Sequence, residues 1–229
     1  MWTCKMGVLC AGLSLGTFLP SCAVETGTTH DEDVQAIGQD LYFKTSVKWG
    51  AQIPVCWLTA GSATEKAWVK AAVAGSWSRY AKVDFTGWGS CPVCNGRCPN
   101  FVGIRVGIAD TTPHTVGLGT ELNMRIPGMA LNFTFKNWSP SCAASASKRE
   151  KCIRSIAVHE FGHALGFAHE QNRPDTPEWC NDPQGSNGNK LLGSWDVDSI
   201  MNYCNPTWNN GGILSAGDIA GVRAAYGAR

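Results

Sequence analysis

Three of the chain's five histidines fall within eleven residues, in the segment HEFGHALGFAH. His159 and His163 are four residues apart, so on a helix both imidazoles lie on one face and can reach a single ion. Glu160 lies about 100° around the helix axis from His159, where it can reach a water next to that ion. Gly166 allows the left-handed turn that would bring His169 back as a third ligand.

This group of side chains has the composition of a catalytic zinc site. Three neutral imidazoles suit zinc and leave one coordination position open to water, which distinguishes catalytic from structural zinc. The simplest alternative is a set of unrelated buried histidines. The extended pattern H-E-x-x-H-x-x-G-x-x-H is much more specific than H-E-x-x-H alone. We therefore expect one catalytic Zn²⁺ ion, whereas His30 and His114 have no partner at ligand spacing and should lie at the surface.

The helix that carries the first two histidines is expected to begin near Arg149. Ile153, Ala157, Phe161 and Leu165 follow at four-residue steps. A helix that is apolar on several sides is buried. The candidate metal site therefore lies on a core helix.

Further helices and strands must support this helix. Ser62 with Glu65, and Ser215 with Asp218, fit capping boxes at the starts of an earlier helix and of a closing helix. The apolar faces of these two helices comprise Val69, Val73, Trp77 and Tyr80, and Ile219, Val222 and Tyr226. Alternating apolar residues predict four strands, around residues 53–57, 83–85, 102–108 and 129–135. The region between residues 171 and 212 is rich in Asn, Gly, Pro and Asp and predicts loops. The expected fold class is α+β.

The N-terminus predicts export. Lys5 precedes an apolar and small-residue run from Met6 to Leu19, which is too short for a membrane span and suits a signal peptide. The sequence LPSC resembles a bacterial lipoprotein signal with Cys22 as the lipidated residue, while ordinary cleavage after Ala23 is the alternative. We expect a bacterial protein that is secreted, or held at the outer cell surface or in the periplasm as a lipoprotein.

Cysteine usage agrees with an oxidising compartment. Eight cysteines follow the leader, and an even set in an exported chain predicts disulfides. We expect the pairs Cys142–Cys152 and Cys180–Cys204, with Cys56 bonded to a cysteine of the cluster CPVCNGRC. A small zinc knot in that cluster is the alternative, although no second ligand cluster is free to complete it.

Length and charge predict one catalytic domain. The 229 residues divide into a signal peptide (1–22), a polar tether or short pro-segment (23–45) and a globular domain (46–229). A net charge of +1 gives no reason to expect nucleic acid as a partner. We expect a monomer that meets a membrane only through a lipid on Cys22.

Two motifs resemble those of a known family. The zinc segment, continued by Glu170-Gln171-x-Arg173, resembles the metzincin metallopeptidases and specifically the astacin group. SIMNY, residues 199–203, resembles the Met-turn of that group, with Asn202 where His is usual. LSAGDIAGVRAAYG resembles the closing metzincin helix, and the resemblance covers roughly residues 45 to 229.

The resemblance implies a fold and roles for individual residues. The fold would have a twisted, mostly parallel sheet with an antiparallel edge strand, two long helices, an active-site cleft and a loop-rich C-terminal subdomain that ends in a helix. MALNFTF, residues 129–135, would be the substrate-binding edge strand. The implied roles are zinc ligation by His159, His163 and His169, general base and acid for Glu160, a fifth ligand and oxyanion donor for Tyr203, a floor beneath the imidazoles for Met201, and a buried polar network for Glu170.

The expected function is zinc-dependent hydrolysis of peptide bonds in proteins or peptides, with Glu160 as general base. One alternative is a zinc-binding or adhesive module without catalysis. Another is a metzincin hydrolase that acts on cell-wall peptides.

Overall fold

The computed structural model describes residues 41–92 and 101–229. The predicted signal peptide, most of the predicted tether, His30, Cys94 and Cys98 lie outside the described residues. Within the described part, no helix combines the length and apolar character needed to cross a membrane.

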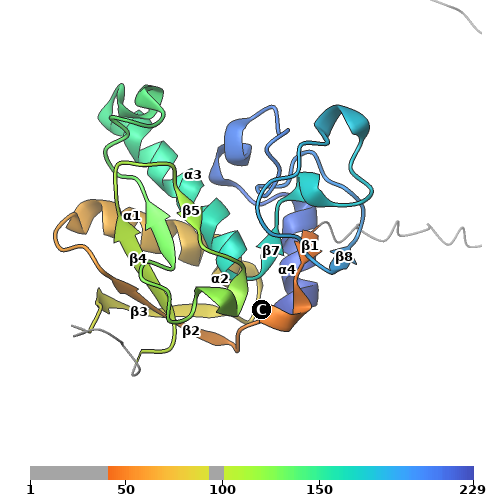
Figure 1. Ribbon diagram of the computed structural model, residues 1–229, viewed down its shortest axis with the longest axis horizontal. Coiled ribbons are helices and arrows are strands. Elements are labelled where there is room, and N and C mark those ends of the chain that lie inside the picture. The colour runs from red at the N-terminus through yellow and green to blue at the C-terminus, as the bar shows by residue number, and fades with distance from the viewer. Residues whose placement is uncertain (1–40, 93–100) are drawn as a thin grey trace, which may run out of the picture. The chain divides into compact units, whose positions relative to one another are not determined.

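A five-stranded sheet forms one layer of the fold, in the order β3-β2-β4-β6-β5 (Figure 1). Its strands are β2 (Gln52–Trp57), β3 (Asp84–Ser90), β4 (Ile104–Ile108), β5 (His114–Thr115) and β6 (Met129–Leu131). β2, β3, β4 and β6 pair in parallel, and β5 pairs antiparallel with β6. The expected mostly parallel sheet with one antiparallel edge strand is confirmed.

The identity of the edge strand was predicted wrongly. The segment 129–135 was expected at the edge, but its strand residues Met129–Leu131 lie between β4 and β5 and are all buried. A parallel strand that is covered on both faces reads as a continuous apolar run, whereas an edge strand has one open side. The edge is His114–Thr115, which is too short to show any periodicity.

The described residues form four α-helices: α1 (Ala63–Gly75), α2 (Trp77–Tyr80), α3 (Ala146–Ala164) and α4 (Ala216–Tyr226). α1 packs against α3 and β3, and α3 also contacts β5 and β6 (Figure 1). α3 begins before the predicted Arg149, because the Ser145 side chain caps it by accepting a hydrogen bond from the Lys148 amide. The α4 capping box of Ser215 and Asp218 is confirmed.

The first helix differs from its prediction in two ways. It is divided at Ser76, so that Trp77 and Tyr80 belong to the separate α2. Ser62 is the N-cap, but its φ of 53° is left-handed and its side chain accepts no capping hydrogen bond. Glu65 pairs instead with Arg149 of α3 at 3.0 Å.

A second, three-stranded antiparallel sheet has the order β7-β1-β8. It joins β1 (Leu41–Phe43), β7 (Phe167–Ala168) and β8 (Lys190–Leu192). Leu41 is fully buried, so the fold already includes β1 and starts before the predicted boundary at residue 46. Short 3-10 helices lie in the connections: η1 (Thr45–Val47), η2 (Gly119–Leu122), η3 (Pro140–Ala143), η4 (Glu170–Asn172), η5 (Glu178–Cys180) and η6 (Trp208–Gly212).

Disulfides fasten the loops around this core. Cys142–Cys152 and Cys180–Cys204 are formed as predicted. Cys56 is bonded to Cys91, so Cys91 is not available as a ligand for a zinc knot. The Cys180–Cys204 disulfide ties the loop after the histidines to the segment that carries the Met-turn.

Candidate metal centre and active site

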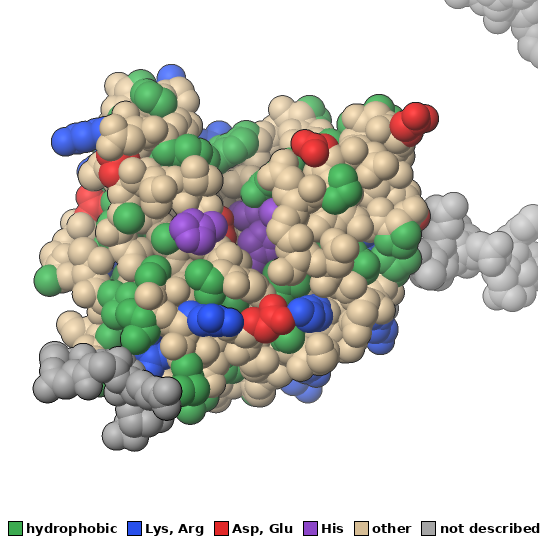
Figure 2. Space-filling view, in the orientation of Figure 1, with side chains coloured by type: hydrophobic (Ala, Val, Ile, Leu, Met, Phe, Trp, Pro, Cys, Tyr) green, Lys and Arg blue, Asp and Glu red, His purple; other side chains and the backbone are tan. Residues whose placement is uncertain are grey.

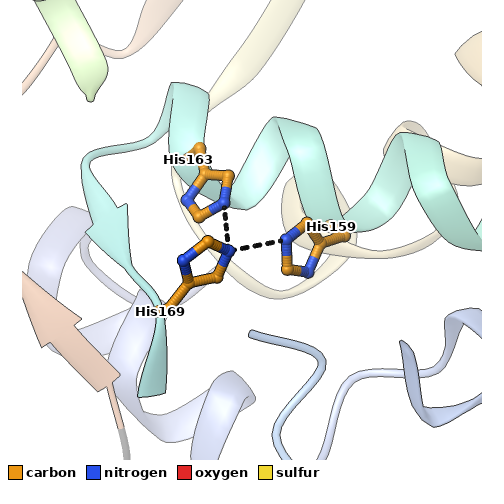
Figure 3. A group of neighbouring side chains, drawn as sticks. All are labelled: His159, His163 and His169. Carbon is orange, nitrogen blue, oxygen red and sulfur yellow. Dashed lines mark hydrogen bonds between the residues drawn. The ribbon is translucent and has the colours of Figure 1, made fainter. Parts of the chain in front are cut away.

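Three imidazoles converge at the C-terminal end of α3 (Figure 3). His159 and His163 lie on successive turns of α3, and His169 follows β7. The Nε2 atom of His169 lies 3.1 Å from that of His163 and 3.3 Å from that of His159. The structure thus brings together the three residues that the spacing predicted.

Gly166 makes this convergence possible. Its φ is +96°, a left-handed value that glycine adopts without the clash of a Cβ atom. A Cβ at this position would also lie 2.9 Å from Cε2 of Phe43 in β1. The turn reverses the chain from α3 into β7 and returns His169 to the other two rings.

Backbone carbonyls fix the orientation of each ring. Nδ1–H of His159 donates to the Ile200 carbonyl at 2.7 Å, and Nδ1–H of His163 donates to the Phe167 carbonyl at 2.8 Å. Nδ1–H of His169 donates to the Gln184 carbonyl at 2.9 Å. Since Nδ1 carries the proton in all three rings, each Nε2 keeps a lone pair directed at the common centre.

This donor set fits zinc. Burial, and secondarily the charge of His169, lowers the pKa of His159 to about 3. Burial also lowers the pKa values of His163 and His169. The rings are therefore neutral at physiological pH, the form in which imidazole binds a metal. Three nitrogen ligands at one centre match a catalytic zinc site.

Glu160 lies beside the histidines with only 4% of its surface exposed. Its Oε2 atom has no hydrogen-bond partner among the described residues. Burial raises the pKa of this carboxyl to about 8. A buried, unpartnered carboxyl with a raised pKa is suited to accept and return a proton near neutral pH.

The Met-turn lies against α3, and its Ile200 carbonyl reaches the ring of His159. Met201 is fully buried, and a Cβ at Gly162 of α3 would overlap its sulfur atom, so thioether and helix backbone are in close contact. Asp218 of α4 holds this turn by accepting hydrogen bonds from the Ser199 hydroxyl at 2.7 Å and the Ile200 amide at 2.9 Å. The sequence predicted Asp218 only as a helix cap, whereas in the structure it also supports Ile200, whose carbonyl orients His159.

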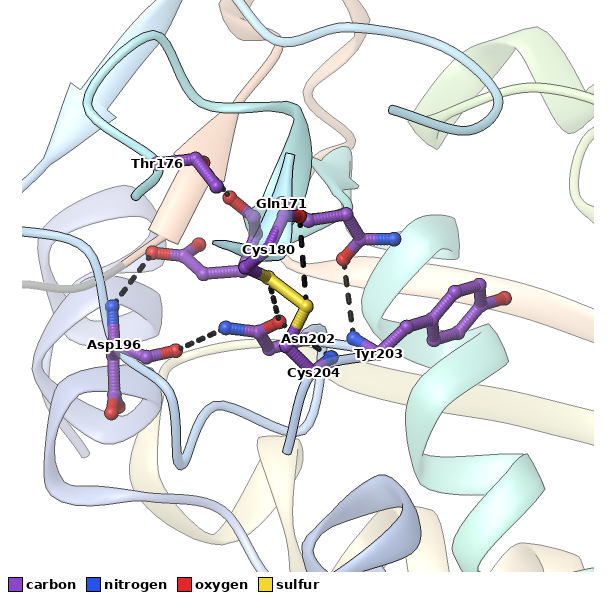
Figure 4. The surroundings of a disulfide bond; sticks show 8 residues. Gln171, Thr176, Cys180, Asp196, Asn202, Tyr203 and Cys204 are labelled. Carbon is purple, nitrogen blue, oxygen red and sulfur yellow. Dashed lines mark hydrogen bonds between the residues drawn. A yellow bond between two sulfur atoms is a disulfide. The ribbon is translucent and has the colours of Figure 1, made fainter. Parts of the chain in front are cut away.

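Tyr203 completes the group. Its ring centroid lies 4.4 Å from that of His169 and 5.4 Å from that of His159, and half of its side chain is exposed. Burial, together with the charge of Glu160, raises the pKa of the phenol to about 12. The hydroxyl therefore stays protonated and can donate a hydrogen bond. The Tyr203 amide donates to Oε1 of Gln171 at 3.2 Å, a contact that the sequence did not predict (Figure 4).

Asn202 stands where the family pattern has His, and its side chain is hydrogen-bonded on both its nitrogen and its oxygen. It is fully buried, and its Nδ2 donates to the Asp196 carbonyl at 2.8 Å (Figure 4). Its Oδ1 accepts from the Cys204 amide at 3.0 Å. These two bonds hold the backbone on both sides of Tyr203 without any contribution to the metal centre.

Glu170 is fully buried behind the site. Its Oε1 lies 3.2 Å from Nε of Arg173 and accepts from the Asp196 amide at 3.3 Å. Burial raises the pKa of this carboxyl to about 8, against the opposing charge of Arg173. The buried polar network expected around Glu170 is present, whereas its expected relation to a mature N-terminus falls outside the described residues.

The site opens into a hollow in which histidine side chains are visible (Figure 2). Two adjoining cavities, of about 430 Å³ and 330 Å³, share Glu160 and Tyr203 in their walls. His114 lines the larger cavity from edge strand β5. It is exposed as expected, but it belongs to the cleft, which its isolated position in the sequence did not reveal.

The comparisons with known proteins agree with this geometry. Residues 143–216 match the family model of the astacin peptidases. Bone morphogenetic protein 1 of Xenopus laevis is 38% identical over 93 residues, covering 32% of this chain and 13% of that protein. Zinc metalloproteinase nas-30 of Caenorhabditis elegans is 37% identical over 65 residues, covering 22% of this chain and 9% of that protein. The chain thus matches only a small part of these relatives' length.

Solved structures show the same fold. Myroilysin aligns with a TM-score of 0.52 and 22% identity, over 80% of this chain and 97% of that one. High choriolytic enzyme 1, described as a hatching enzyme zinc-protease from Oryzias latipes, aligns with a TM-score of 0.52 and 19% identity, over 81% and 96%. The extended histidine motif, the Met-turn and the family match over residues 143–216 coincide in one site, so this part of the chain is similar to the astacin peptidases.

Proposed function

We propose that this chain is a zinc-dependent endopeptidase that hydrolyses peptide bonds of protein substrates. One observation carries the proposal. Three imidazole nitrogens with free lone pairs lie in one cleft with the buried carboxyl of Glu160, whose Oε2 has no partner among the described residues, and with the hydroxyl of Tyr203. The residues that would hold the ion are His159, His163 and His169, through Nε2. When bound, zinc supplies Lewis-acid chemistry: it polarises the carbonyl and makes water nucleophilic near neutral pH.

The chain's own residues perform the proton transfers and the positioning. Glu160 takes a proton from the water that attacks the peptide carbonyl, and returns it to the leaving amine as the C–N bond breaks. Tyr203 donates a hydrogen bond to the oxygen that gains negative charge. Edge strand β5 offers unpaired backbone groups to an extended peptide, which provides affinity with little sequence preference.

The decisive comparison is between the parent and Glu160→Gln, with an unstructured protein as substrate. We expect Glu160→Gln to retain zinc and thermal stability but to lose about 10²–10⁴-fold in kcat. A chelator should abolish the parent's activity, and added zinc should restore it. Digestion by Glu160→Gln at the parental rate would remove Glu160 from the proposed role.

The two alternatives give different results in the same assays. A non-catalytic zinc-binding or adhesive module would hold zinc and cleave neither unstructured proteins nor cell-wall peptides. A cell-wall hydrolase would release fragments from purified peptidoglycan and leave unstructured proteins intact. The presence of Glu160 and Tyr203 beside the ligands favours catalysis over the first, and the open edge of β5 favours an extended polypeptide over the second.

We also propose export to an extracellular location, which the disulfides at Cys56–Cys91, Cys142–Cys152 and Cys180–Cys204 support. A signal peptide at residues 1–22, a lipid on Cys22 and a monomeric state remain part of this proposal. N-terminal sequencing and intact mass of the exported protein would test the first two, and light scattering would test the third.

A further inference from the structure

The cleft continues beyond the histidines into a second cavity of about 330 Å³, which we call the aromatic lobe. Three large apolar side chains that the larger cavity lacks characterise it: Trp138, Ile156 and Trp208. The remaining wall residues are Thr112, Pro113, His159, Glu160, Gln184, Tyr203 and Asn209. Because Glu160 and Tyr203 also line the larger cavity, a substrate that reaches them can extend into the aromatic lobe.

Ile156 places the lobe next to the reacting groups. It lies four residues before Glu160 on α3, so both side chains are on the same face of the helix, one turn apart. Ile156 is almost fully buried, with 3% of its surface exposed. It therefore forms a fixed apolar surface within one helical turn of the proposed general base.

Trp208 forms an accessible wall that is held in place by its own segment. It is 46% exposed, although it begins the short helix η6 that packs along α3. Asn209 and Asn210 have left-handed φ values of 46° and 43°, and the Asn210 side chain ties the turn by donating to the Ile213 carbonyl at 2.9 Å. At Gly212 a Cβ would lie 2.9 Å from the Ser155 hydroxyl oxygen, so η6 is pressed against α3.

The two parts of the cleft differ in chemistry. The larger cavity includes His114, Thr115 and Ser186, which are absent from the aromatic lobe and suit polar contacts and backbone pairing. In the aromatic lobe, the only ionisable groups among the described wall residues are His159, Glu160 and Tyr203, all of which belong to the proposed reaction centre. Apart from them, the lobe offers no charged partner to a substrate side chain, so burial of an apolar group is the interaction that it favours.

We propose that the aromatic lobe is the specificity pocket of the enzyme and takes a large apolar, above all aromatic, side chain of the polypeptide at one position that flanks the cleaved bond. This inference rests on the proposed endopeptidase function and adds the class of substrate. Trp208 and Trp138 are its specificity-determining residues. Hydrophobic pockets discriminate by roughly 10–200-fold for a single methylene group, so a change from Phe to Ala in the substrate should cost at least about 10²-fold in kcat/KM.

Two measurements test this inference. In the first, the parent digests a peptide library, and mass spectrometry records the residues around each cut. We expect aromatic and large aliphatic residues to be enriched at one flanking position and acidic residues to be depleted there. Trp208→Ala should reduce the preference for Phe over Ala about tenfold, Trp208→Phe should preserve it, and Trp208→Lys should raise cleavage beside Asp and Glu. Zinc content and melting temperature establish that each variant is folded.

Trp179→Ala is the matched control. Trp179 is 68% exposed, packs edge-to-face against Trp195 and lines neither cavity. Its loss should leave the cleavage profile unchanged. A profile without apolar enrichment, or one that is the same in the parent and in Trp208→Ala, would overturn the inference while leaving the endopeptidase function intact.

The second measurement does not need turnover. Fluorescein-labelled peptides that differ only in Phe, Ala or Asp at the preferred position are titrated with zinc-loaded Glu160→Gln, and anisotropy reports binding. The Phe peptide should bind at least tenfold more tightly than the other two, and Trp208→Ala in the same background should remove that difference. Equal binding of all three peptides would contradict the pocket, whatever the catalytic assays show.

Discussion

At the scale of single residues, the metal centre depends on Nδ1 of each imidazole as well as on Nε2, the atom that would bind the metal. Each Nδ1–H is bound by a carbonyl from a different segment: Ile200 in the Met-turn, Phe167 in β7 and Gln184 in the loop after η5. These bonds fix the tautomer that leaves Nε2 free for a metal. The sequence motif specifies the ligands, but the folded chain supplies the carbonyls that orient them.

The phenol of Tyr203 offers a prediction at this scale. With its pKa raised to about 12, the hydroxyl remains a hydrogen-bond donor at neutral pH. Tyr203→Phe removes the donor but keeps the ring against His169, so we expect kcat to fall by about 10²-fold with little change in KM. Steady-state kinetics on a peptide substrate measure both constants. Unchanged turnover would exclude Tyr203 from oxyanion stabilisation.

At the scale of elements, α3 and the turn at Gly166 determine whether the third ligand arrives. Replacing Gly166 by Ala forces a side chain into left-handed backbone and places Cβ 2.9 Å from the Phe43 ring. We expect Gly166→Ala to lower the free energy of unfolding by about 1–3 kcal/mol and to weaken zinc binding, because His169 is displaced. Urea denaturation and competition with a chromogenic zinc chelator report the two effects.

Gly50→Ala is the control for that substitution. Its φ is not positive, and an added Cβ would meet nothing within 4 Å. Unfolding and zinc binding should both match the parent. Parental stability and zinc affinity in Gly166→Ala would show that the turn does not position His169.

The elements also show what can be predicted from sequence. The apolar steps from Ile153 to Leu165 predicted α3, and the histidine spacing predicted the metal centre, because both signals are local and repeat over several turns. Strand β5 has two residues and β7 has two, which is too few for any periodicity. The pairing of β1 with β7 and β8 depends on contacts between distant segments, so a polar tether was predicted where a strand forms.

The site was likewise predictable only in part. Motif residues such as Glu160 and Met201 were found by their spacing, whereas the contact of Gln171 with Tyr203 and the aromatic lobe were not. Ile156 and Trp208 are 52 positions apart in the sequence and line one cavity only because η6 packs along α3. No short pattern can encode such an arrangement, and the same holds for the support that Asp218 gives to the Met-turn.

At the scale of the whole molecule, buried carboxyls link stability to pH. Burial raises the pKa of Asp218 from 3.8 to about 7. Between these values the folded protein holds more protons than the unfolded chain, so the free energy of unfolding falls as pH rises through this window and levels off above it. Glu170, with a pKa raised to about 8, adds a slope of the same sign.

Asp218→Asn should flatten that dependence. The variant loses one titrating group, so its slope between pH 4 and 7 should be smaller than the parent's by up to about 1.4 kcal/mol per pH unit. It should also be less stable at every pH, since an amide cannot accept all the hydrogen bonds from Ser199, Ile200 and Ser215. Urea denaturation at several pH values measures both, and identical slopes in variant and parent would refute the linkage. Asp182→Asn, at an exposed position, controls for the change of acid to amide.

The central claim is that three Nε2 atoms hold one zinc ion and leave part of its coordination sphere open to solvent. X-ray absorption spectroscopy at the zinc edge, on purified protein with its metal content quantified, tests this most directly. One zinc per chain, bound by three imidazole nitrogens and at least one exchangeable oxygen, is the predicted result. A protein without stoichiometric zinc, or an ion enclosed entirely by side chains, would contradict the account.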